Sequence, residues 1–209
     1  MLRDYGYEAK NGYNLSPDGP QFFHRTMGNN YLIRKQSEGF MVYGEASLIK
    51  GDSPLDMRYL KQKYSKVPDG IVLYSEQQGG TKKGFYMTDW VEVESAYKPY
   101  SDVSKALRLL SENPTLTPDA ACQIHKIVFV YDSRQNHERR LVSYLLRFLR
   151  DSGGLSLSVT LDSIEFARCT VTPPLSWKSY EQFSAIDMLK QYGKWPLNTA
   201  AYEELSELF

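Results

Sequence analysis

The sequence predicts an α/β fold built on a mixed sheet. GIVLYS, residues 70–75, is a short apolar run, and FYMTDWVEVES, residues 85–95, is a strand rich in aromatic and β-branched residues. The glycines of the QQGGTKKG segment between them indicate a hairpin connection. HKIVFVYDS, residues 125–133, is a continuous apolar run of the kind buried on both faces, and with the helix and strand that follow it makes a βαβ unit.

The bulk composition narrows the class of protein. The chain has 209 residues, enough for one domain with a real core, and its 25 basic and 25 acidic residues balance. Any binding to a polyanion must therefore come from a local patch. Cys122 and Cys169 lie far apart and outside any CxxC spacing, which disfavours a zinc site or a disulfide framework and is typical of a reducing cytoplasm. No apolar run approaches the ~18 residues that span a bilayer, so we expect a cytoplasmic protein without a membrane partner.

The first seventy residues give weaker signals. The first twenty are irregular and rich in Gly, Asn, Tyr and Pro, which predicts an arm. QFFHRTMGNNYLIRK has a helical pattern broken by Gly28 and Asn29, and FMVYGEASLIK fits either the end of a strand or a short helix. PLDMRYLKQKYSK, from Pro54, fits a short helix or an exposed connection.

The second half is clearer. SDVSKALRLLSEN, residues 101–113, and HERRLVSYLLRFLRDSGG, residues 137–154, have apolar residues at helical spacing, and LSLSVTLDSIEFARCTV alternates as a strand. After Thr170 the prolines, aromatics and two short helical patterns predict a C-terminal helical extension. Whether that extension packs on the core or offers a surface to a protein partner is left open.

An acidic cluster is expected at the hairpin. A strand places Trp90, Glu92 and Glu94 on one face, and two carboxylates there are costly unless arginines, a shared proton or a metal ion compensates them. If the hairpin pairs, Asp69 lies near Glu92. Mg²⁺ suits such a group, because it accepts one or two carboxylates and takes the rest of its shell from water and phosphate oxygens.

Pro68-Asp69 followed by Glu92-Val93-Glu94 resembles the PD-(D/E)xK nuclease superfamily, whose restriction-endonuclease-like αβββαβ core carries a mixed central sheet. The resemblance implies a metal-dependent DNA endonuclease in which Asp69 and Glu92 bind Mg²⁺ or Mn²⁺, and Glu45 is the candidate for a further acidic ligand. PDG is also among the commonest turn tripeptides, and an EVE strand is most often a solvated sheet face.

The third motif position departs from that superfamily, because Glu94 stands where lysine is usual. Some members use an ExE variant and others supply the lysine from a neighbouring helix, so Glu94 is the first candidate for the third catalytic group, with Lys98 second and Lys105 as another source. Pro99 restricts Lys98 to an extended conformation, which allows but does not ensure a fold back over the site.

VPDGIVL and WVEVESAYK, with HRTMGNNYLI upstream, are also similar to replication-relaxation type proteins of plasmids and other mobile elements. We therefore divide the chain into an N-terminal arm or partial accessory segment at 1–40, a nuclease-like α/β domain at 41–170 and the C-terminal extension at 171–209.

The basic residues and histidines have a simpler interpretation by default. Lys61, Lys63 and Lys66 and the arginines of residues 137–154 read as solvated faces, and His24, His125 and His137 as surface or capping residues. In a nuclease, Lys82 and Lys83 at the hairpin tip and Lys105 on the next helix would contact DNA phosphates.

The alternative is a non-cleaving DNA- or protein-binding accessory protein of plasmid or phage replication or mobilisation on the same fold. The missing lysine favours this alternative, and the retained acids favour the nuclease. The sequence leaves open the form of the DNA, the sequence preference and the oligomeric state.

Overall fold

A computed structural model describes most of the chain. The described residues are 20–74, 86–112, 116–117, 122–133, 136–151, 161–172 and 176–192. The arm at 1–19, the hairpin tip with Lys82 and Lys83, and the terminal segment from 193 lie outside them. None of the described helices is both long and apolar enough to cross a membrane.

The architecture is α/β, with a six-stranded mixed open sheet in the order β1-β2-β3-β4-β5-β6. The strands are β1 (Met41–Gly44), β2 (Gly70–Tyr74), β3 (Tyr86–Glu94), β4 (Cys122–Asp132), β5 (Ile164–Thr172) and β6 (Ser176–Ser184). The helices are α1 (Pro20–Ser37), α2 (Glu45–Lys50), α3 (Met57–Tyr64), α5 (Tyr100–Glu112), α6 (His137–Asp151) and α8 (Ala185–Tyr192). Strands β3, β4 and β5 are parallel, and the outer pairs β1–β2, β2–β3 and β5–β6 are antiparallel.

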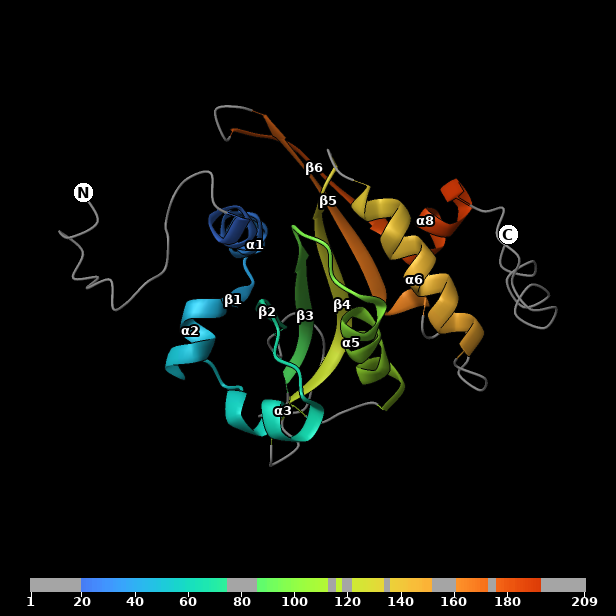
Figure 1. Cartoon of the computed structure of the whole chain (residues 1–209). Coiled ribbons are helices and arrows are strands. Elements are labelled where there is room, and N and C mark those ends of the chain that lie inside the picture. The colour runs from blue at the N-terminus through green and yellow to red at the C-terminus, as the bar shows by residue number, and fades with distance from the viewer. Residues whose placement is uncertain are drawn as a thin grey trace.

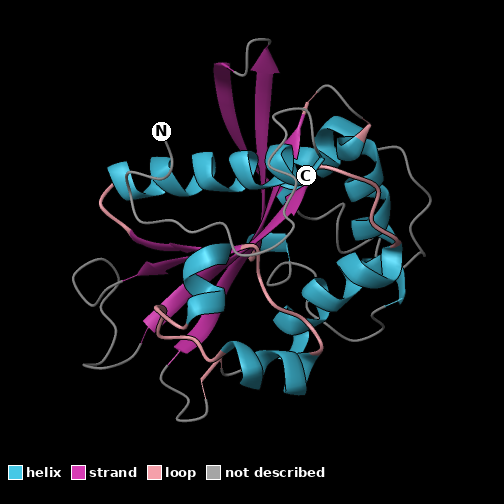
Figure 2. Cartoon of the chain, turned by 60° about the vertical axis from the view of Figure 1, so that its left-hand side comes forward, coloured by secondary structure: helices cyan, strands magenta, loops and turns pink. Residues whose placement is uncertain are grey.

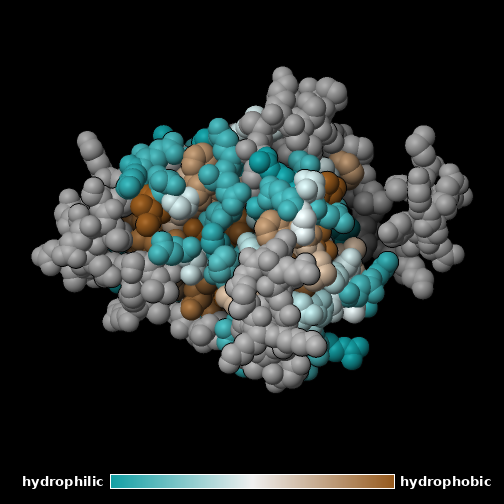
Figure 3. Space-filling view, turned by 180° about the vertical axis from the view of Figure 1, so that it is seen from behind, coloured by the Kyte–Doolittle hydropathy of each residue, from teal (hydrophilic) through white to brown (hydrophobic). Residues whose placement is uncertain are grey.

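The sheet is covered on both faces (Figure 1). Helices α5, α6 and α8 lie on one side and α1 lies on the other. Figure 2 brings α1 forward, where it lies across the strands. Alternation along each strand explains the two layers, since Trp90 and Phe129 enter the core beneath α5 and α6, whereas Val91 and Val93 pack against α1. On the side opposite to that of Figure 1, hydrophobic residues lie in small areas between hydrophilic ones (Figure 3).

The predicted hairpin and βαβ unit are confirmed. Strands β2 and β3 pair antiparallel with Ile71 opposite Trp90. Strands β4 and β5 are parallel neighbours in the sheet, and α6 lies between them in the chain. The ambiguous FMVYGEASLIK segment is both a strand and a helix, because β1 ends at Gly44 and α2 begins at the next residue. The segment after Pro54 is the helix α3, and the Asp56 carboxylate caps it by accepting the backbone N–H groups of Arg58 and Tyr59.

The C-terminal prediction needs correction. The segment predicted to be a helical extension begins with β6, which pairs antiparallel with β5 and extends the sheet, and helix α8 follows. The predicted boundary at 170 therefore falls inside the β5–β6 pair. The strand was missed because residues 173 and 174 are both prolines, which read as the end of regular structure.

The N-terminal prediction also changes. Helix α1 runs without interruption through Gly28 and Asn29, and it buries Met27 and Tyr31 against the sheet, so residues 20–37 belong to the α/β core. Glycine at 28 has a packing reason, because a Cβ atom there would meet Val93 Cγ2 at 3.0 Å. Gly28 weakens the helical pattern of the sequence, but its lack of a side chain lets α1 lie close to β3.

We expect Gly28→Val to lower the free energy of unfolding by about 2 kcal/mol, because its methyl groups push α1 away from Val93. Gln36→Val, at an exposed position of the same helix, is the matched control and should change it by less than about 0.7 kcal/mol. Urea denaturation followed by circular dichroism measures both. Because valine has a higher helix propensity than glycine, a loss in Gly28→Val no larger than that in Gln36→Val would contradict the explanation by the close approach to β3.

Candidate active site

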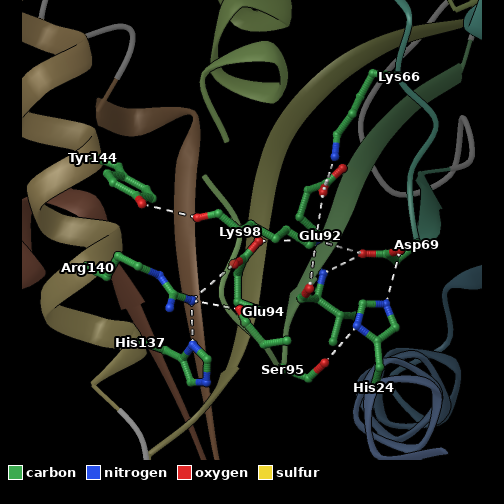
Figure 4. Close-up of polar contacts among 12 residues, drawn as sticks. His24, Lys66, Asp69, Glu92, Glu94, Ser95, Lys98, His137, Arg140 and Tyr144 are labelled. Atoms are coloured by element: carbon green, nitrogen blue, oxygen red, sulfur yellow. Dashed lines mark hydrogen bonds and ion pairs between the residues drawn. The ribbon is translucent and has the colours of Figure 1, made fainter. Parts of the chain in front are cut away.

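Three carboxylates meet where β2 begins and β3 ends (Figure 4). Asp69 directly precedes β2, and its backbone N–H donates to Val91 O at 2.9 Å, which fixes it beside β3. Glu92 and Glu94 lie near the end of β3 and are buried, with 2% and 0% of their surface exposed. The predicted proximity of Asp69 to the Glu92 face is therefore observed.

The Lys98 ammonium lies between these carboxylates. Its Nζ atom is 3.2 Å from Glu94 Oε1, 3.5 Å from Glu92 Oε2 and 3.7 Å from Asp69 Oδ2. It also donates to Val93 O at 2.9 Å, so the side chain folds back over the end of its own strand. Burial lowers the pKa of Lys98, but Glu92, Asp69 and Glu94 outweigh it and raise the pKa above its usual value. Lys98 is thus a permanent cation shared by three acids.

Glu92 has a protein partner on each oxygen. Trp90 Nε1 donates to Oε1 at 2.7 Å, and the Lys66 ammonium donates to Oε2 at 2.7 Å. The indole lies two residues away on the same strand face, where the alternation of a strand places it. These contacts satisfy both oxygens of a carboxylate that is almost fully buried.

Asp69 is connected to α1. Its Oδ1 atom lies 3.2 Å from His24 Nε2, and its Oδ2 atom accepts the Val93 N–H at 2.8 Å. The other ring nitrogen of His24 is 2.9 Å from Ser95 Oγ. Burial by itself raises the pKa of Asp69, but the His24 hydrogen bond and the Lys98 charge outweigh it and lower the pKa to about 2.

Glu94 has the least satisfied carboxylate of the three. Neither oxygen makes a hydrogen bond, although Lys98 Nζ and Arg140 Nη2 lie 3.2 and 3.6 Å away. Burial raises the pKa of Glu94; Lys98 opposes the rise and Glu92 adds to it. Glu94 is therefore a buried negative charge that offsets the positive charges of Lys98 and Arg140 and has no contact with solvent.

The other predicted residues are more dispersed. Glu45 lines a small pocket shared with Asp69, His24 and Asn29, where its Oε2 pairs with Arg25 Nε at 3.0 Å. Lys105 is exposed on α5 and lies 3.6 Å from Asp102 Oδ1, so its predicted contact with DNA stays a prediction. Lys82 and Lys83 lie outside the described residues.

Sequence reasoning missed three members of the site, namely His24, Lys66 and Arg140. Each had been interpreted as a surface or solvated residue, and each contacts an acid of the cluster. Lys66 stands three residues before Asp69, a proximity that could have drawn attention to it. His24 and Arg140 come from α1 and α6, on opposite sides of the sheet, and no local pattern points to them.

The donor set is compatible with magnesium. Carboxylate oxygens are the ligands Mg²⁺ prefers, and Asp69 and Glu92 already direct oxygens toward one cation, the Lys98 ammonium. Within the described residues, no group of three or more His, Cys, Asp or Glu side chains has the arrangement to hold a metal ion. Mg²⁺ is commonly bound through one or two carboxylates while it keeps several waters, and Asp69 and Glu92 are two carboxylates.

No family model, curated protein or solved structure matches this chain. The chemistry assigned to the site is therefore argued from its geometry.

The Asp69 carboxylate should make stability depend on pH. Its pKa falls from 3.8 to about 2 on folding, so the folded chain binds this proton more weakly than the unfolded chain. The resulting stability, about 2 kcal/mol, is present above pH 4 and is lost as the pH falls from 4 toward 2. We expect Asp69→Asn to be less stable than the native chain at pH 7, with the difference shrinking at pH 3. Urea denaturation across this range measures it, with Asp102→Asn as the exposed control. Parallel stability curves for the native chain and Asp69→Asn would contradict the assignment.

Removing the shared cation should destabilise the fold in a pH-dependent way. Without the ammonium, Lys98→Met leaves three carboxylates close together. The Lys98 charge lowers the pKa values of Asp69 and Glu94, so these two values rise and the folded state takes up protons that the unfolded chain does not bind. We expect a loss of roughly 3 kcal/mol at pH 8 and a smaller loss at pH 5.

Adding Glu94→Gln to Lys98→Met should recover part of that loss, because it removes one of the repelling charges. Lys105→Met, at an exposed lysine, is the matched control. An equal loss at both pH values, or no recovery in the double variant, would mean that Lys98 acts through packing of its stem instead of its charge.

Proposed function

We propose that the chain is a metal-dependent DNA nuclease, or a nuclease-derived DNA-processing protein, of the PD-(D/E)xK type. The observation that carries the proposal is the convergence of Asp69, Glu92 and Lys98 at one point, from the start of one strand, the end of its neighbour and the turn that follows. An aspartate, a glutamate and a lysine are the residue types of that superfamily's site, and here the lysine arrives from a different position in the chain.

The order of elements supports the same proposal. Helix α1, strands β1, β2 and β3, helix α5 and strand β4 follow one another as in an αβββαβ core, with α2 and α3 inserted between β1 and β2. The pairing is mixed, because β2 and β3 are antiparallel whereas β3 and β4 are parallel. Asp69 precedes the second strand and Glu92 lies on the third, as the resemblance implies.

Each side chain has a separate role in this proposal. Asp69 and Glu92 would hold Mg²⁺ or Mn²⁺, which when bound polarises a phosphodiester and lowers the pKa of an attacking water. Lys98, with 24% of its side chain exposed, is placed to donate to a phosphate oxygen or to orient that water. Glu94 is buried, so we assign it to holding Lys98 and Arg140 in position. This reverses the order of preference that the sequence suggested for the third catalytic group.

A specific observation favours the non-cleaving alternative. Both oxygens of Glu92 already have protein donors, and the charges of Lys66, Lys98 and Arg140 balance the three carboxylates. A site that is neutral by itself has less need of a metal ion. Titration calorimetry with Mn²⁺ separates the two proposals, because a scaffold has no reason to bind the ion and Asp69→Asn should abolish binding in a nuclease.

Cleavage assays on labelled duplex and single-stranded DNA with Mg²⁺ or Mn²⁺ test the chemistry. We expect Asp69→Asn to abolish cleavage while DNA binding is preserved or tightened, because the substitution removes a negative charge that repels phosphate. Asp102→Asn, which removes an exposed carboxylate on α5, should cleave as the native chain does. Equal loss of binding and cleavage in Asp69→Asn would indicate a folding defect.

The same assay assigns the third group. Lys98→Met should reduce the rate by two or more orders of magnitude, the usual size of a lost charge-stabilising or proton-transferring group. Glu94→Gln should reduce it less. The reverse order would return the role to Glu94, and no effect from either would leave the nuclease proposal without its chemistry.

A further inference from the structure

Three tyrosines and two arginines form a strip beside the acidic cluster. Tyr97 and Tyr100 come from the segment that leads from β3 into α5, and Arg140, Tyr144 and Arg147 come from α6. We call these five residues the tyrosine–arginine strip. The candidate DNA contacts Lys82, Lys83 and Lys105 do not belong to it.

Aromatic rings and guanidinium groups alternate along the strip. Arg140 Cζ lies 5.2 Å from the centre of the Tyr97 ring, and Arg147 Cζ lies 4.1 Å from the centre of the Tyr100 ring. Tyr100 and Tyr144 meet edge to face with their centres 5.5 Å apart. Tyr97 is 74% exposed, so most of this side chain remains open to a ligand although Arg140 lies over its ring.

Arg147 gives the strip an exposed positive charge in a chain of balanced charge. The side chain of Arg147 is 54% exposed, and its ion pair with Asp151, at 3.5 Å, is a surface pair of little energetic value. Burial and Asp151 raise the pKa of Tyr100, whereas Arg147, Arg108 and Arg150 all act to lower it, so several arginines bear on this ring. The total charge of the chain is balanced, so a polyanion would bind only at a local group of positive charges such as these arginines.

The strip leads directly to the acidic cluster. The Tyr144 hydroxyl donates to Lys98 O at 3.1 Å, and Arg140 Nη2 donates to Ala96 O at 2.9 Å while it lies 3.6 Å from Glu94 Oε2 (Figure 4). Arg140 and Arg147 are separated by seven residues, or about 10 Å along a helix, and this spacing of two turns places them on the same face of α6. The residues that hold the shared lysine thus also form the beginning of the strip.

We propose that unpaired nucleotides of a DNA strand bind along the tyrosine–arginine strip, with their bases on the tyrosine rings and their phosphates beside Arg140 and Arg147. Single strands expose base faces that can stack on aromatic side chains, whereas a duplex keeps those faces inside its own stack. The proposal rests on the proposed function, because the strand on the strip is the substrate that it delivers to Asp69, Glu92 and Lys98.

Fluorescence anisotropy with a labelled oligothymidylate in EDTA tests binding without cleavage. Tyr97→Ala should weaken binding about tenfold, since stacking of one base is lost, and Tyr97→Phe should retain most of the affinity. Arg147→Gln should weaken binding and reduce the slope of log affinity against log salt by about 0.7. Ile49→Ala and Lys61→Gln, exposed residues of α2 and α3, are the matched controls and should leave affinity unchanged.

A duplex of the same length should bind more weakly than the single strand. The strip proposal is overturned if the native chain does not bind the oligonucleotide, if it prefers the duplex, or if Tyr97→Ala binds as tightly as Tyr97→Phe. If the single strand binds as expected but no metal ion supports its cleavage, the nuclease proposal fails and the strip proposal stands. If a single strand is cleaved equally well by the native chain and by Tyr97→Ala, the nuclease proposal stands and the strip proposal fails.

Discussion

The contact of the Lys98 ammonium with three carboxylates is the interaction on which the rest of the site depends. Glu92 and Glu94 are buried on a central strand, where unpaired charges would cost several kcal/mol each. Lys98 compensates them and also reaches Asp69, so it joins two strands through one charge. Pro99 favours an extended backbone at Lys98, and α5 begins at the residue after this proline, so a short segment places the ammonium.

The two helical layers act on this cluster from opposite sides. Helix α1 lies close to β3 because glycine stands at position 28, and this approach brings His24 to Asp69. Helix α6 brings Arg140 to Glu94 and the Tyr144 hydroxyl to the carbonyl of Lys98. The site is therefore formed by residues of α1, of the sheet and of α6. A displacement of either helix would alter the charge balance around the carboxylates.

The charge balance also bears on how the site could work. Three acids facing three cations form a set of charges whose positions are fixed before any ligand binds, and in the proposed nuclease this set would not need to reorganise during the reaction. Because these charges balance one another, the site needs no metal ion for charge neutrality. The structure is therefore compatible with both cleavage and binding alone. Cleavage and binding alone share the same geometry of the carboxylates. They differ in whether a metal ion binds and in whether the DNA strand is cut.

Local patterns in the sequence determined the hairpin, the βαβ unit and the acids on one face of β3, because strand alternation and helical periodicity act over a few residues. They also placed Asp69 beside that face through the pairing of β2 with β3. Strand β6 escaped prediction, since its place in the sheet depends on β5 and not on its own pattern. The continuity of α1 through Gly28 depended on the distance to Val93. Tertiary structure alone decided that Lys98 folds back and that His24, Lys66 and Arg140 join the acids, because these contacts link segments whose proximity is created only when the helices pack on the sheet.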